Sequence, residues 1–109
     1  MPDIDIFDPA SFFDRKIQEL QEHIIENRTR LEIQQANQRN VERALSCLVQ
    51  LDPAQQKALQ MELLALQEAA ANAEKVIEAL TVEIASQTGK LSALQAAKDL
   101  VEVAARSEG

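Results

Sequence analysis

Apolar residues recur along most of the chain at alternating intervals of three and four positions, the spacing typical of helices that pack on other helices. In the first half, two sets follow this spacing without a slip. The first set is Phe13, Leu20, Asn27, Gln34, Val41 and Leu48, and the second is Ile17, Ile24, Leu31, Gln38 and Leu45. We call these the seam positions. They predict a helix from about residue 9 to about residue 50.

The second half repeats the pattern. One set of its seam positions is Leu59, Leu66, Ala73, Leu80, Gln87, Leu94 and Val101, and the other is Leu63, Ala70, Ile77, Ile84, Leu91, Lys98 and Ala105. They predict a second helix over about residues 53–105. Gly89 lowers helix propensity, and the alternative to a continuous helix is a kink at residues 87–90. Because the register passes through Gly89 unchanged, we favour a continuous helix.

Each predicted helix opens with the same tripeptide, Asp8-Pro9-Ala10 and Asp52-Pro53-Ala54. Aspartate is a favoured N-cap residue, and proline suits the first helical position. The connection at residues 51–53 is so short that the two helices must run antiparallel. The sequence therefore predicts an all-α fold, in which a tail (residues 1–8) precedes a long, coiled-coil-like antiparallel helical hairpin (residues 9–107).

Several large apolar residues fall outside the seam, and they widen the apolar surface beyond what two helices can cover. Self-association would bury this surface, so we expect a homodimer that forms a four-helix bundle. A complex with another helical protein is the alternative. Four candidate partner-binding residues of this kind are Ile25, Ile33, Leu64 and Val76.

Asn27, Gln34 and Gln38 form a polar stretch of the seam, opposite the alanine-rich segment at residues 69–73. The first interpretation is that small residues leave room for long amide side chains, which fix register and oligomeric state at a cost in stability. The second interpretation is that this stretch is where the hairpin opens or binds a partner.

The net charge of −7 and the pI of about 4.6 make nucleic acid an unlikely partner and give no attraction to an anionic membrane. The first helix carries most of the arginines and is neutral overall, whereas the second helix is net acidic, which suits cross-helix ion pairs within or between subunits. No signal peptide or membrane-spanning run is evident, so we expect a cytoplasmic protein.

The sequence offers little catalytic chemistry. His23 is the only histidine and Cys47 the only cysteine, and about 36 Å of helix separates them. We expect His23 at the surface and Cys47 buried or half-buried as a packing residue. No motif predicts a catalytic residue, a cofactor site or a metal site, and we expect the protein not to be an enzyme.

The tail alternates acidic and apolar residues from Asp3 to Phe7. It could fold back on the hairpin, stay disordered or serve as a docking peptide. Ile4, Asp5, Ile6 and Phe7 resemble the bacterial sliding-clamp-binding pentapeptide, usually glutamine, leucine, serine or aspartate, leucine and phenylalanine. Asp3 stands where that peptide has glutamine. The resemblance implies a route to the replication machinery through Ile4, Ile6 and Phe7.

We therefore expect a non-enzymatic interaction module, such as an adaptor, chaperone or assembly factor, that acts through a self-associating helical surface. The alternative is an acidic inhibitor of the phage or mobile-element type. Such a protein would dock on a DNA-processing protein, with the tail as one contact, or would mimic nucleic acid.

Overall fold

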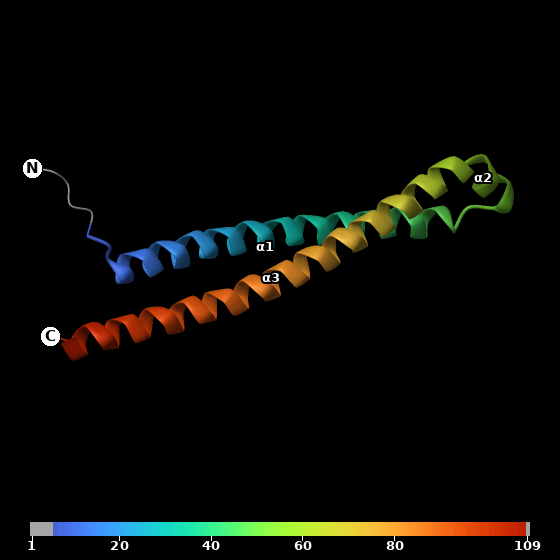
Figure 1. The fold of residues 1–109 in the computed structure, drawn as a ribbon. Helices are drawn as coiled ribbons and strands as arrows, with labels where there is room; N and C mark the ends of the chain where they lie inside the picture. Colours follow the sequence, from blue (N-terminus) through green and yellow to red (C-terminus); the bar gives the residue numbers. More distant parts are fainter. Residues whose placement is uncertain (1–5, 109) are drawn as a thin grey trace, which may run out of the picture. The chain divides into compact units, whose positions relative to one another are not determined.

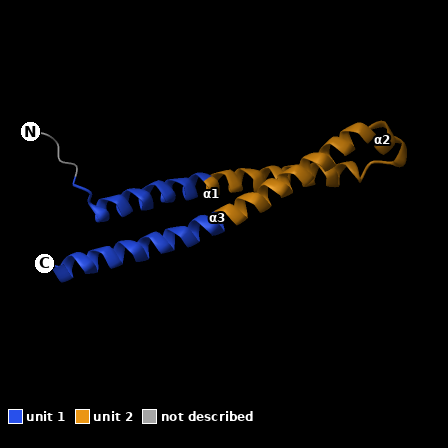
Figure 2. Ribbon diagram, viewed as in Figure 1, with its two compact units in different colours: residues 1–26, 84–109 blue, residues 27–83 orange. Residues whose placement is uncertain are grey.

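The computed structural model describes residues 6–108, and all regular secondary structure among them is helical. The helices are α1 (Pro9–Leu48), α2 (Pro53–Ala58) and α3 (Gln60–Glu108), as Figure 1 shows. Two compact units divide the chain (Figure 2): unit 1 comprises residues 1–26 and 84–109, and unit 2 comprises residues 27–83. Within each unit, a segment of α1 packs antiparallel on a segment of α3, which confirms the predicted all-helical fold of two long packed helices.

Asp8 starts α1 as an N-cap. Its carboxylate accepts hydrogen bonds from the Ala10 amide at 3.2 Å and from the Ser11 hydroxyl at 2.8 Å. The hydrogen bond from Ser11 lowers the pKa of the Asp8 carboxyl below its ordinary value. The Ala10 amide, one of the backbone groups that the first turn leaves without a helical partner, is thereby paired. A charged carboxylate also lies at the positive end of the helix dipole.

A capping box starts α2. The Asp52 carboxylate accepts a hydrogen bond from the Gln55 amide at 2.8 Å, and the Gln55 side chain accepts one from the Asp52 amide at 3.3 Å. The Gln56 side chain then closes the turn, because its amide group donates to the carbonyls of Val49 and Leu51 at 3.0 and 2.9 Å. The turn is thus held by side chains of α2.

The second half of the hairpin is interrupted at Leu59, which the sequence did not predict. Leu59 has φ −106° and ψ 24°, and its amide lies 3.1 Å from the Gln55 carbonyl and 3.2 Å from the Gln56 carbonyl. This shared hydrogen bond tightens the end of α2 and separates it from α3. In contrast, α3 runs without a break through Gly89, where a Cβ atom would meet nothing within 4 Å.

The seam positions line the contact between α1 and α3 within each unit. All of them are buried or half-buried except Ala105, which is exposed. The core is nevertheless thin. Among the described residues only Ile24 in unit 1 and Asn27, Ala73 and Leu80 in unit 2 are buried, and no large side chain is fully enclosed.

Candidate interaction surface

The polar part of the seam borders a hollow in unit 2. Gln34 and Val41 of α1 line this hollow opposite Ala73 of α3, and its volume is about 390 Å³. Gln38 is half-buried beside this region, and Asn27 is buried with 5% of its surface exposed. Small alanine side chains therefore leave space where the facing residues are long amides.

One side of unit 2 beside this hollow carries two matching strips of residues, each spaced by four, three, four and three positions. The spacing keeps each strip on one flank of its helix, next to the seam. We call the two strips together the amide–alanine face. Its members are Ile33, Asn37, Asn40, Ala44 and Cys47 from α1 and Ala65, Ala69, Asn72, Val76 and Ala79 from α3. Five of these ten residues line the hollow or its rim: Asn37, Asn40, Ala69, Asn72 and Val76.

The four apolar candidates on the helices are all exposed, with 62% of the Ile25 surface accessible to solvent, 54% for Ile33, 51% for Leu64 and 41% for Val76. They do not form one continuous stripe. Ile33 and Val76 belong to the amide–alanine face, Leu64 lies outside both strips, and Ile25 belongs to unit 1. Exposed apolar surface is therefore distributed over several sides of the hairpin.

The described part of the tail begins at Ile6, and the candidate Ile4 lies outside the described residues. Ile6 and Phe7 precede α1 in non-helical backbone and expose 82% and 71% of their surfaces. The Phe7 ring lies 5.6 Å from the Phe12 ring, which lies 5.3 Å from the Phe13 ring. The tilted ring contact places Phe7 beside the first turn of α1.

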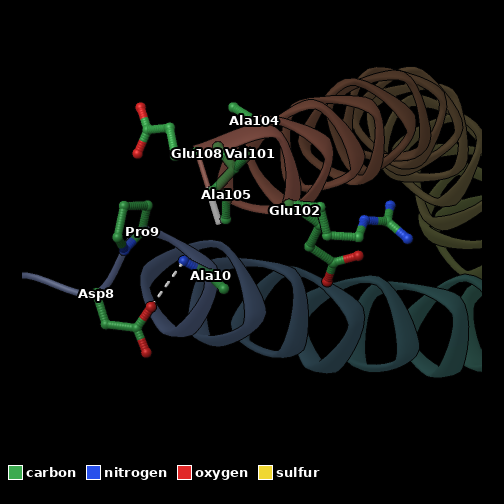
Figure 3. A pocket seen from close by; sticks show the side chains of 9 residues that line it. Asp8, Pro9, Ala10, Val101, Glu102, Ala104, Ala105 and Glu108 are labelled. Atoms are coloured by element: carbon green, nitrogen blue, oxygen red, sulfur yellow. Dashed lines mark hydrogen bonds between the residues drawn. The ribbon is translucent and has the colours of Figure 1, made fainter.

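A second hollow, of about 700 Å³, lies in unit 1 between the first turn of α1 and the last turns of α3 (Figure 3). Pro9 and Ala10 face Val101, Ala104 and Ala105 across it. Carboxylates occupy parts of its border, but its lining includes no histidine, cysteine or lysine. The Asp8 carboxylate is already engaged in capping α1, and the other charged residues of the lining are Glu102, Arg106 and Glu108.

Lys98 occupies a seam position in unit 1, and the sequence did not indicate its partner. Its ammonium lies 2.6 Å from the Asp14 carboxylate of α1 and 3.7 Å from the Glu102 carboxylate one turn further along α3. The hydrogen bond to Asp14 raises the pKa of Lys98 above its ordinary value, and the charge of Asp14 adds to the effect. The long lysine stem lets its charged end leave the seam and meet a carboxylate at the rim.

The arginines behave differently from Lys98. Among residues 6–108, no ion pair of 4 Å or shorter involves an arginine. The predicted pairing of arginines on α1 with glutamates on α3 therefore does not occur within one chain, and such pairing remains available between chains.

The single histidine and the single cysteine lie on the surface. His23 approaches Glu26 of the same helix at 3.9 Å, and both side chains are well exposed. Cys47 is an exposed free thiol, so the expectation of a buried or half-buried packing residue was wrong. Its seam neighbours Leu45 and Leu48 are half-buried, whereas Cys47 lies on the exposed flank of α1 that belongs to the amide–alanine face.

Among residues 6–108, no three histidine, cysteine or acidic side chains gather closely enough to hold a metal ion. None of the helices over the same residues has a stretch of the length and hydrophobicity that crossing a membrane requires.

No protein-family model matches the chain, and neither does any curated protein or solved structure.

Proposed function

We propose that the protein is a non-enzymatic interaction module, an adaptor, chaperone or assembly factor, that acts through a self-associating helical surface. The observation that carries the proposal is the shortage of buried surface. Only four described residues are buried, whereas apolar side chains such as Ile33, Leu64 and Val82 expose half of their surface or more. A second pair of helices would cover such residues in a four-helix bundle.

The accessible surface area supports the same proposal. The single chain exposes 8346 Å². A folded monomer of 12.1 kDa is expected to expose about 6,000 Å². The excess is on the order of 2,000 Å², similar to what one subunit buries in a large obligate dimer. A second copy of the chain is the simplest source of the missing contacts, because its concentration always matches that of the first.

Sedimentation equilibrium over a wide range of protein concentrations tests this proposal directly. We expect a species of twice the 12.1 kDa chain mass, and we expect helicity measured by circular dichroism to fall as the dimer is diluted. A monomer that keeps its full helicity at every concentration would contradict self-association. In that case the protein would need a different helical partner.

The exposed end of the tail favours a second candidate function, docking on a DNA-processing protein. Ile6 and Phe7 have the exposure that a docking peptide needs, and the segment resembles the sliding-clamp-binding peptide. A pull-down with a purified bacterial clamp tests it, with Ile6→Ala/Phe7→Ala as the variant and Ile25→Ala as an exposed apolar control. Binding that survives the double substitution would reject this function.

A further inference from the structure

The amide–alanine face of unit 2 contains no charged residue. The two helix segments that carry it, residues 33–47 and 65–79, do include charges, but all of them lie on other sides of their helices. They are Arg39, Glu42, Arg43, Glu68, Glu74, Lys75 and Glu78. Depletion of charge is what distinguishes the centre of a protein interface from the surrounding surface.

The same face also permits close approach. Four of the five residues that α3 contributes are alanine or valine, and the hollow of about 390 Å³ opens between the two strips. Small side chains let helix backbones come near one another, and a hollow accepts a protruding side chain. Ile33 protrudes from the same face with 54% of its surface exposed.

The charges outside the face are divided between the two helices. In unit 2, the α1 segment carries four arginines and two glutamates, a net charge of +2, whereas residues 60–83 of α3 carry five glutamates and one lysine, a net charge of −4. None of these arginines lies within 4 Å of a carboxylate among residues 6–108 of its own chain. An arrangement of α1 over α3 of a second copy therefore brings opposite charges together, whereas α1 over α1 would oppose like charges.

We propose that two copies of this chain dock through their amide–alanine faces, with α1 of each copy over α3 of the other and with both turns at the same end of the dimer. Gln34 and Ala73 line one hollow and are therefore level within a chain. In this arrangement Ile33 of one copy lies level with Ala73 of the other and enters its hollow. The inference rests on the self-association proposed above and names the surface and the orientation.

The surface is tested by placing a charge on it. Ala69 and Ala71 are both exposed alanines of α3, but only Ala69 lies on the proposed interface. We expect Ala69→Arg to weaken dimerisation by roughly 100-fold, and the matched control Ala71→Arg to change it by less than about threefold. Asn72→Asp introduces a charge of nearly the same shape on the face and should also weaken dimerisation, even if Ala69→Arg disturbs folding.

The orientation is tested by a distance between spin labels in the dimer. Gln50 is exposed in the turn and lies off the face, so the variant Cys47→Ser/Gln50→Cys carries one label per chain. With both turns at one end, we expect a separation below about 25 Å. If the two hairpins instead ran antiparallel and met at the centre of the same face, the two labels would lie about 40 Å apart, at a rise of about 1.5 Å per residue.

The outcomes separate the two proposals. A wild-type monomer at all concentrations would overturn both the function and the interface. A wild-type dimer that tolerates Ala69→Arg and Asn72→Asp would leave self-association in place and reject this face. A separation near 40 Å would reject the arrangement of α1 over α3.

Discussion

Lys98 of α3 lies 2.6 Å from Asp14 of α1, measured from the ammonium nitrogen to a carboxylate oxygen. The pair joins the two helices of unit 1 at a seam position where most neighbouring layers hold aliphatic residues. A register shift by one helical turn would separate the two groups by about 5 Å along the helix axis. The ion pair therefore favours one alignment of α1 on α3.

The ion pair predicts a particular dependence of stability on alkaline pH. The Lys98 pKa is raised above 10.5 in the folded protein. Its contribution to stability is therefore complete below the unfolded pKa and is lost as the pH rises through the folded pKa. We expect Asp14→Asn to destabilise the protein at pH 8 and to reduce the loss of stability above pH 10.5, as measured by urea unfolding across this range.

Asp99→Asn is the matched control for this experiment, because Asp99 is exposed next to Lys98 and has no ion pair among the described residues. It removes the same charge from the same region. Equal alkaline profiles for the two variants would show that net charge, and not the contact between Lys98 and Asp14, determines the behaviour.

Gly89 predicts a stabilising substitution. The residue is exposed within α3, its φ is not positive, and a Cβ atom there would have no neighbour within 4 Å. We expect Gly89→Ala to raise the free energy of unfolding by about 0.5–1 kcal/mol, because alanine loses less backbone entropy in a helix. Urea unfolding measures it, and the reverse change at exposed Ala93, Ala93→Gly, should lower stability by a similar amount.

The capping box at Asp52 predicts that removing this side chain destabilises the turn. Asp52→Ala removes the acceptor of the Gln55 amide and should cost about 1 kcal/mol of unfolding free energy. Gln50→Ala is the control, because Gln50 is exposed in the same turn and its side chain has no hydrogen bond among the described contacts. If the two variants unfold alike in denaturant, the capping box does not stabilise α2 measurably.

Replacing a polar seam residue with an apolar one should raise the stability of the protein and make its oligomeric state less uniform. Gln38 is half-buried at a seam position, so Gln38→Leu should add roughly 1 kcal/mol by burying apolar area. It should also broaden the distribution of oligomers, because polar seam residues disfavour alternative registers. Gln35→Leu makes the same change at an exposed position, and sedimentation velocity should show no change in its oligomers.

The seam and the two aspartate caps could be predicted from the sequence because both depend on local rules, the helical period and the hydrogen bonding of a helix start. The break at Leu59 could not. Leucine is a good helix former there, and the shared hydrogen bond that ends α2 depends on how the turn closes. Lys98 was identified as a seam residue, but finding Asp14 as its partner required the three-dimensional rotation of both helices.

The exposure of Cys47 was mispredicted for a related reason. Its seam neighbours Leu45 and Leu48 bracket it in sequence, but the seam is narrow, and a residue between two seam positions can face solvent. Cysteine is one of the residue types most often buried in proteins. In this chain, the rotation of α1 about its axis determines that Cys47 is exposed.

The turn has a consequence for the order of folding. Its hydrogen bonds join residues no more than seven apart, from Gln56 to Val49, whereas Lys98 and Asp14 are separated by most of the chain. Closing a short loop loses little chain entropy. Once the turn has formed, each further contact between α1 and α3 closes only a short additional loop. The kinetically easiest route therefore starts at the turn and zips toward the ends, so unit 2 gains structure before unit 1.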